Sequence, residues 1–235
     1  MDTYQPRYIV DMPTAGMLDN LQYSVNAQLV NNGGFLLDVT VGLFKIVNVG
    51  MSYGGTGIIG YQTMNMQKYP GFHIKGRILQ EKENVPAIAL GFNSQGKGTY
   101  DKGAERHEQL APDLYAAVSK SFKWAIGSLV LSGGINYSLL VPDEKGINVY
   151  AGIEQSILNI CGLSFEFNPN LNDKDKKEHI WNPEKNSSIM LNGAIKFTPL
   201  EDMIIEVQFK DILRNSKLAN EVGRYFGVSF ISKLF

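Results

Sequence analysis

Cysteine and histidine are scarce in this chain, which limits the chemistry it can carry out. Cys161 is the only cysteine among 235 residues, so no disulfide can form within the chain and no thiolate cluster can hold a metal. The three histidines, His73, His107 and His179, are far apart, and none belongs to a closely spaced ligand pair. The sequence therefore predicts neither a metal site nor a cofactor.

A surplus of charge and long apolar runs are missing as well. The 22 basic and 23 acidic residues leave a formal net charge of −1, which gives no signal for nucleic acid as a partner. No apolar run reaches the roughly 18 residues that a membrane helix needs. A membrane β-barrel needs no such run, because its strands alternate between apolar and polar residues. The composition therefore leaves a membrane barrel open while giving no sign of a membrane helix.

What the chain does have is a two-residue rhythm, which is plainest between Leu21 and Leu29. Leucine, tyrosine, valine, alanine and leucine occupy the odd positions there, and polar residues occupy the even ones. Such alternation places the two sets of side chains on opposite faces of a β-strand. The rhythm predicts an all-β fold, a single antiparallel up-and-down barrel. Its twelve strands are expected at 21–30, 35–44, 46–53, 72–80, 85–92, 114–122, 128–139, 147–155, 161–168, 188–197, 203–210 and 222–230.

The connections between these strands alternate in length. The short ones fall at 44–46, 80–84, 123–127, 156–160 and 198–202, and the longer ones, rich in Gly, Asn, Asp and Lys, at 54–71, 93–113, 169–187 and 211–221. Two connections on the long side, 31–34 and 141–146, are tight. Short periplasmic turns opposite longer outer loops are the plan of bacterial outer-membrane barrels. Both ends of the chain are then expected on the short-turn side.

The two faces of each strand differ in a way that indicates which one meets water. Between residues 47 and 52, valine, valine and methionine alternate with asparagine, glycine and serine, and most other strands read alike. Twelve strands leave a lumen too wide for apolar side chains to fill easily, so a barrel that is apolar outside and polar within fits this pattern. The alternative, a soluble barrel that binds an apolar ligand inside, requires Leu37, Val49, Ile74 and Ile205 to face inward.

Aromatic residues gather near the predicted strand ends, where membrane barrels carry two interfacial belts. One belt is expected at the short turns and consists of Phe44, Trp124, Phe197 and Phe235. The other is expected at the long loops and consists of Tyr53, Phe72, Phe92, Tyr137 and Phe209.

The last residues of the chain, 225–235 (YFGVSFISKLF), resemble the C-terminal strand of outer-membrane β-barrels, which commonly ends in Phe and is read by the barrel-assembly machinery. Lys233 departs from that pattern, because an apolar residue is usual there. Residues 86–96 and 114–122 resemble an uncharacterised group of bacterial barrels and, more distantly, the YjbH-like exopolysaccharide-associated outer-membrane proteins. The resemblance implies a bacterial outer-membrane location, with membrane lipid and the assembly machinery as partners.

Charged residues on the polar faces are the candidate functional residues of the lumen. His73, Lys75 and Arg77 share one face of one strand, beside strands that present mostly small groups there. They predict either an anion-attracting constriction or a cross-lumen network in which Glu154 and Glu166 neutralise them. The full set of expected lumen-lining residues is His73, Lys75, Arg77, Glu154, Glu166, Lys196, Glu206 and Lys210.

One stretch, residues 91–98 (GFNSQGKG), nearly spells a phosphate-binding loop. That motif needs Ser or Thr after its lysine, where this chain has Gly98, and it needs a helix that residues 99–103 do not offer. We expect a flexible outer loop instead. The charged run 172–179 likewise has no apolar face and is expected to be a solvated loop.

The sequence therefore predicts two parts: residues 1–20, a periplasmic segment or a plug of the lumen, and residues 21–235, the barrel. Residues 1–20 lack the basic start and apolar stretch of a signal peptide, so an exported chain with this start would be a mature form, a shortened chain or one with a misassigned start codon. The expected function is that of a small polar channel, passing small polar or anionic solutes, or of a scaffold in envelope or polysaccharide export. The protein is not expected to be an enzyme. The remaining alternative is an outer-membrane lipid hydrolase, for which the sequence has no local signature.

Overall fold

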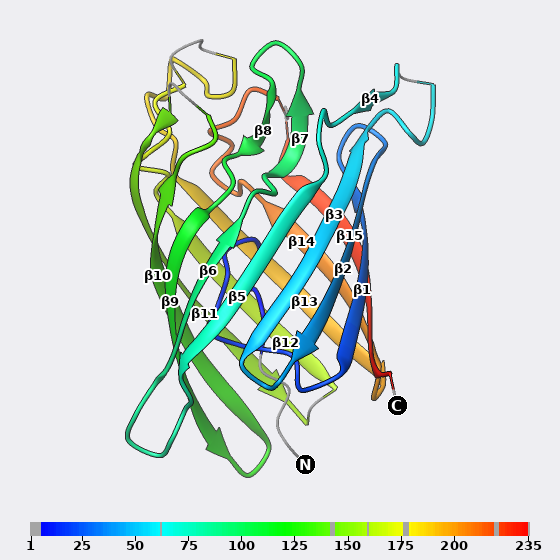
Figure 1. Ribbon diagram of the computed structural model, residues 1–235. Coiled ribbons are helices and arrows are strands. Elements are labelled where there is room, and N and C mark those ends of the chain that lie inside the picture. The colour runs from blue at the N-terminus through cyan, green and yellow to red at the C-terminus, as the bar shows by residue number, and fades with distance from the viewer. Residues whose placement is uncertain are drawn as a thin grey trace.

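The computed structural model describes residues 6–61, 63–141, 144–158, 160–175, 179–218 and 221–234. Twelve long strands form the wall of one barrel (Figure 1). They are β1 (Gln22–Val30), β2 (Gly34–Leu43), β3 (Val47–Thr56), β5 (Gly71–Leu79), β6 (Ala87–Asn93), β9 (Asp113–Trp124), β10 (Gly127–Ser138), β11 (Gly146–Ile157), β12 (Cys161–Asn168), β13 (Met190–Leu200), β14 (Met203–Lys210) and β15 (Gly223–Lys233). All twelve strands predicted from the alternation are present. No helix in the described part of the chain is long and apolar enough to cross a membrane.

The barrel closes because β1 pairs with the last strand as well as with the second. Val25 lies opposite Phe230 of β15 on one side and opposite Val39 of β2 on the other. Eleven of the twelve neighbouring pairs have antiparallel ladders between described residues. The remaining pair, β9 and β10, is joined by a two-residue turn, and the hydroxyls of Ser119 and Ser132 lie 2.9 Å apart across it. The predicted closed antiparallel barrel is confirmed.

The barrel is apolar on the outside and polar within. On β12 the side chains of Leu163, Phe165 and Phe167 are exposed, whereas those of Ser164 and Glu166 are buried. The alternation is therefore the inverse of that in a soluble barrel, whose apolar face lies inside. Leu37, Val49 and Ile74 are likewise exposed, and Ile205 is half-buried, so the soluble-barrel alternative does not fit.

The two ends of the barrel differ as the connection lengths predict. The short turns, the start of β1 and the end of β15 lie at one end (Figure 1). The tight turns 31–34 and 44–46 are of the kind that suits hairpins, with positive φ at both central residues: 59° and 61° at Asn32 and Gly33, and 53° and 60° at Phe44 and Lys45.

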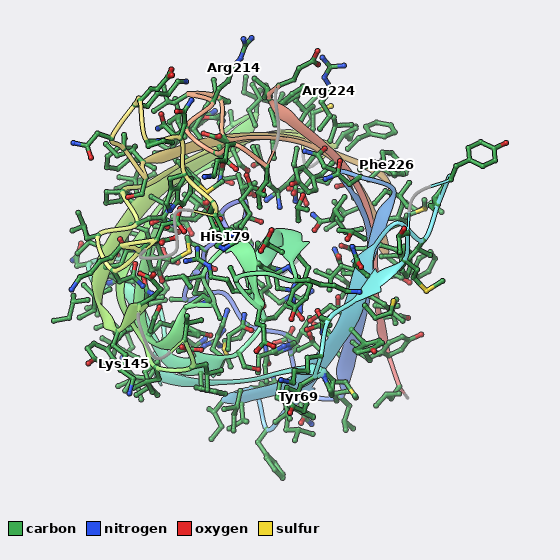
Figure 2. All side chains as sticks on the ribbon, turned by 90° about the horizontal axis from the view of Figure 1, so that it is seen from above. Tyr69, Lys145, His179, Arg214, Arg224 and Phe226 are labelled. Atoms are coloured by element: carbon green, nitrogen blue, oxygen red, sulfur yellow. The ribbon has the colours of Figure 1, made fainter. Side chains whose placement is uncertain are left out.

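The outer connection 93–113 is not the simple flexible loop that the sequence suggested. It contains a hairpin of β7 (Lys97–Asp101) and β8 (Arg106–Gln109), and Figure 2 shows it within the ring of strands. Its glycines allow close packing of the two strands: a Cβ on Gly98, whose φ is +80°, would lie 2.7 Å from Glu108 Oε2. The glycine spacing that resembled a phosphate-binding loop thus serves this hairpin. A further short strand, β4 (Asn65–Met66), pairs with β3 in the connection 57–70.

Candidate functional site: the filled lumen

The described start of the chain, residues 6–20, lies inside the barrel (Figures 1 and 2). It folds back on itself, because the N–H of Ile9 donates to Met12 O over 2.9 Å and the N–H of Thr14 donates to Arg7 O over 3.0 Å. Ile9, Met12 and Ala15 are almost wholly buried. We refer to residues 6–18 as the N-terminal segment.

Glu166 on β12 holds the turn of this segment. Its Oε2 accepts hydrogen bonds from the backbone N–H groups of Val10, Asp11 and Met12, at 3.0, 2.8 and 2.8 Å. The side-chain amide of Asn192 donates to the other carboxylate oxygen over 2.9 Å. Three consecutive N–H groups that converge on one point form a typical backbone site for an anion. A carboxylate from the barrel wall fills that site here.

Lys75 on β5 holds the two arms of the segment. Its Nζ donates to the backbone oxygens of Arg7, Thr14 and Gly16, at 3.1, 3.0 and 3.1 Å. An ammonium group has three protons to donate, so these three acceptors satisfy it. The ring of Tyr8 lies 5.5 Å from the same nitrogen, within the range of a cation–π contact. The lysine predicted to line an open lumen is therefore bound to the chain's own backbone.

Further contacts come from β11, β13 and β14. Lys196 donates to Ile9 O over 3.3 Å and forms an ion pair with Glu154. Lys210 forms an ion pair of 2.6 Å with Asp11 of the segment. The segment is thus bound by wall residues on several strands.

Two more wall side chains bind the second arm of the segment. The hydroxyl of Tyr150 donates to Pro13 O over 2.9 Å, and the N–H of Ala15 donates to Ser119 Oγ over 3.0 Å. Both side chains come from long strands, β11 and β9.

Small residues on the inner face make room for the segment. A Cβ on Gly42 would lie 2.2 Å from Asp19 O, and one on Gly152 would lie 2.5 Å from Ile9 Cγ2. Ala87 and Ala89 of β6 pack against Ala15 in a buried cluster. The small side chains beside the predicted cations of β5 thus adjoin the N-terminal segment. They are the signal that could have indicated an internal occupant.

The β7–β8 hairpin meets the N-terminal segment from the outer side. The side-chain amide of Gln109 donates to Met12 Sδ over 3.1 Å, and Lys97 Nζ lies 5.2 Å from the centre of the Tyr8 ring. Thr99, Arg106, Glu108 and Gln109 are buried. The two insertions therefore touch each other inside the barrel.

A buried ion pair fixes the hairpin to the loop that follows β12. Arg106 donates through both terminal nitrogens to the Asp173 carboxylate, at 2.9 and 2.5 Å, and one of these nitrogens also donates to Glu108 O over 3.0 Å. Bidentate pairs of this kind are stronger and more directional than single hydrogen bonds.

His107 lies against the other side of the hairpin. Its Nδ1 is 3.1 Å from Gly98 O and its Nε2 is 3.1 Å from the side-chain nitrogen of Gln95. Burial lowers the pKa of His107 to about 4, so the imidazole is neutral near pH 7. Burial raises the pKa of Glu108, its neighbour on β8.

The spaces that remain beside both insertions are small. One cavity of about 10 Å³ lies between the hairpin and the wall, lined by residues that include Leu36, Thr56 and His107. Another of about 10 Å³ lies between the segment and the wall, lined by residues that include Gly16, Ala87 and Ser119. Each has room for about one water molecule.

The predicted lumen residues have specific partners rather than a common site. His73 lies 3.0 Å from Thr40 Oγ1 and 3.4 Å from the Asp38 carboxylate. Arg77 and Glu206 are half-buried. Glu154 and Glu166 were expected to pair with the cations of β5. Instead, Glu154 forms its ion pair with Lys196, and Glu166 accepts hydrogen bonds from the backbone of the N-terminal segment. A role of these residues in selectivity stays a prediction.

The predicted belt aromatics lie mostly on the outer face. Phe44, Tyr53, Phe72, Trp124, Tyr137 and Phe197 are exposed, Phe92 and Phe209 are half-buried, and Phe235 lies outside the described residues. Exposure alone does not assign a side chain to a lipid boundary, so the belts stay a prediction.

A hydrolase would use a histidine in its catalytic site, so the neighbours of the three histidines are relevant to that alternative. His73 and His107 have the partners named above, and His179 lies 3.9 Å from Asp101 in the outer loops. Within the described ranges, no group of three or more His, Cys, Asp or Glu residues is arranged to hold a metal.

Comparisons with known proteins bear on the fold. No family model and no curated protein matches the chain. The solved outer-membrane protein Omp33 of Acinetobacter baumannii superposes with a TM-score of 0.50 at 8% identity, covering 91% of this chain and 98% of that one. The fold is that of an outer-membrane β-barrel.

Two porins of similar shape superpose slightly less well. KdgM matches with a TM-score of 0.49 at 10% identity, covering 89% of this chain and 98% of its own. NanC matches with a TM-score of 0.48 at 8% identity, covering 91% of this chain and 100% of its own. At these identities the likeness concerns the fold alone. The more distant resemblance to YjbH-like proteins stays a prediction.

Proposed function

We propose that the protein is a gated channel of the bacterial outer membrane, and that the structure corresponds to its closed state. The N-terminal segment is the plug and the β7–β8 hairpin is an outer cap. The observation that carries this proposal is the binding of Lys75 by three backbone oxygens of the segment. A charged lumen residue is thereby satisfied by a part of the chain that precedes β1 and is not a strand of the wall.

The nature of the contacts supports a plug that can leave. Glu166, Lys75, Lys196 and Lys210 bind the segment through hydrogen bonds and ion pairs. Water can replace such contacts, so each contributes only about 0.5–1.5 kcal/mol net when neutral and about 1.5–3 kcal/mol when charged. The polar wall left behind would be wetted.

The cations of β5 give the proposed channel its solute preference. Withdrawal of the segment removes all three acceptors of Lys75, which lies on the same face as His73 and Arg77. A free ammonium beside a guanidinium attracts anions, as charged rings do in selective pores. We therefore infer that small polar solutes pass and that anionic ones are favoured.

A reversible lock tests the plug. Ala15 and Ala89 pack in one buried cluster, so Ala15→Cys with Ala89→Cys, in a Cys161→Ser background, joins segment and wall by a disulfide. Oxidised protein refolded into planar bilayers should stay closed, and reductant should restore the openings of the background protein. The Ala15→Cys protein without the second cysteine is the control. Openings that persist in the oxidised double variant would exclude the segment as the gate.

The scaffold alternative makes the opposite prediction for the same chain. A barrel that serves export machinery as a permanently closed anchor should insert, fold and carry no current, whether or not residues 6–18 are present. The filled lumen fits this second candidate as well as it fits a closed channel, so the deletion variant distinguishes the two.

For the solute preference, the paired change Lys75→Glu and Arg77→Glu is made in the chain that lacks residues 6–18. Anion preference in a salt gradient should fall or reverse relative to the same deletion with both residues intact. An unchanged anion preference would show that Lys75 and Arg77 of β5 do not determine the selectivity of the channel.

A further inference from the structure

The connection between β3 and β5 exposes apolar side chains at the outer end of the barrel. Ile59 and Met64 are 55% and 58% exposed, Tyr61 is fully exposed, and Ile58 is also exposed. The sequence from Gly57 to Gln67 contains no Asp, Glu, Lys or Arg, whereas the other long outer loops are rich in charge. We refer to residues 57–61, 63 and 64 as the flap.

Backbone hydrogen bonds fix the base of the flap. The N–H of Gly57 donates to Asn32 O over 2.8 Å, and those of Ile58 and Ile59 donate to Gly33 O over 2.9 and 2.8 Å. Gly33 has a φ of +61°, and a Cβ there would lie 1.9 Å from Ile59 O, so glycine is required for this approach. The outward direction of the flap is therefore built into the fold.

The flap points away from the lumen. In Figure 2 the segment that follows β3 extends beyond the ring of strands, whereas the β7–β8 hairpin extends into it. Figure 1 shows the same segment beside the outer end of the barrel, next to β4. It takes no part in the closure of the lumen described above.

In the outer loop between β12 and β13, by contrast, two apolar side chains are buried within the protein. Ile180 and Trp181 are buried and pack against Met190. Asp175 accepts hydrogen bonds from the N–H groups of Ile180 and Trp181, at 2.8 and 2.7 Å. These hydrogen bonds hold the backbone of the loop in place at the two buried residues. The apolar side chains of the flap are exposed and have no such cover among the described residues.

We infer that the flap docks into the outer boundary of the membrane and that lipid is its partner. The flap begins at the end of β3, whose exposed Tyr53 belongs to the outer aromatic positions, and Phe72 of the paired strand β5 is exposed beside it. It therefore continues the lipid-facing surface. Tyr61 suits such a boundary, where aromatic rings lie between acyl chains and headgroups. Four side chains are too few for a standard protein interface, which uses about 20–30 residues on each side.

Site-directed fluorescence tests this assignment in the intact barrel. Ile59→Cys in a Cys161→Ser background, labelled with the polarity-sensitive dye NBD, is refolded into vesicles that contain lipid carrying a nitroxide near the headgroup. The matched control is Glu184→Cys, an exposed position in a different outer loop. Dye at position 59 should show a blue-shifted emission and loss of intensity to the nitroxide, whereas dye at position 184 should show neither.

Two results would overturn the assignment. Equal emission and equal quenching at both positions would show that the flap lies in water. Emission from position 59 that changes with the protein-to-lipid ratio, together with disulfide cross-linking between barrels of the unlabelled Ile59→Cys protein, would identify a second copy of the chain as the partner. A shift in mobility between heated and unheated protein on gels confirms that each variant is folded. Because the flap is separate from the lumen, neither result bears on the gating proposal.

Discussion

The two insertions that fill the lumen differ in how they are attached, and the difference separates a gate from a cap. The N-terminal segment precedes β1, the first described strand of the wall, whereas the β7–β8 hairpin lies between two strands of the wall, β6 and β9. The segment is bound mainly by wall side chains that contact its backbone. The hairpin is bound by the Arg106–Asp173 pair within the outer loops. A segment that lies before the first strand of the wall can withdraw without breaking a strand pair of the wall, so the segment is the part expected to move.

The largest effect of a single substitution is expected at Lys75. Lys75→Met keeps the length of the side chain but leaves three segment oxygens without their donor. Charge-assisted hydrogen bonds contribute about 1.5–3 kcal/mol each, so the ratio of open to closed channels should rise roughly 100-fold or more. Single-channel recording measures this ratio. Lys45→Met, an exposed position in the turn between β2 and β3, is the control and should change it far less.

Glu166→Gln should open the channel by a smaller factor. The amide oxygen still accepts from the segment's N–H groups, but without the negative charge that three consecutive donors favour. We expect roughly a tenfold rise in the open-to-closed ratio. Glu184→Gln, in an exposed outer loop, should have no effect. A Glu166→Gln protein that gates like the wild type would contradict the role given to this carboxylate.

Weakening the hairpin should affect access from outside more than conductance. Arg106→Lys removes the bidentate geometry with Asp173 but keeps the charge. A thiol at Thr99→Cys, in a Cys161→Ser background, should then react several times faster with an impermeant reagent added to the outer side. A thiol at Ala15→Cys, on the N-terminal segment, should keep its rate. Equal acceleration at both positions would mean that hairpin and segment move as one unit.

Acid should loosen the hairpin slightly. The docked pKa of His107 is about 4, below the ordinary 6.5, so the docked state binds fewer protons between these values. The contribution of His107 to the stability of the docked hairpin is therefore fully present above pH 6.5 and is lost as the pH falls towards 4. Glu108, whose pKa is raised by burial, acts in the opposite direction. Labelling rates of Thr99→Cys across this range should lose their acid-induced rise in a His107→Gln variant.

The same contrast explains what could be predicted from the sequence. The wall could be predicted because its signal is local. The alternation within β12 alone, from Cys161 to Asn168, separates the outward side chains from those that face the lumen. The hairpin strands have only five and four residues, too few for a rhythm to stand out. The position of the segment depends on contacts such as Val10 with Glu166, which are 156 residues apart and follow no local rule. Gly42 and Gly152 on the inner face were the available clue.

The most direct test of this account is single-channel conductance of the full chain beside the variant that lacks residues 6–18, both refolded into planar bilayers and checked for folding on gels. The account predicts a full-length protein that is mostly closed and a deletion variant with steady conductance. A folded, inserted deletion variant that carries no more current than the full chain would contradict it and leave the barrel as a closed scaffold.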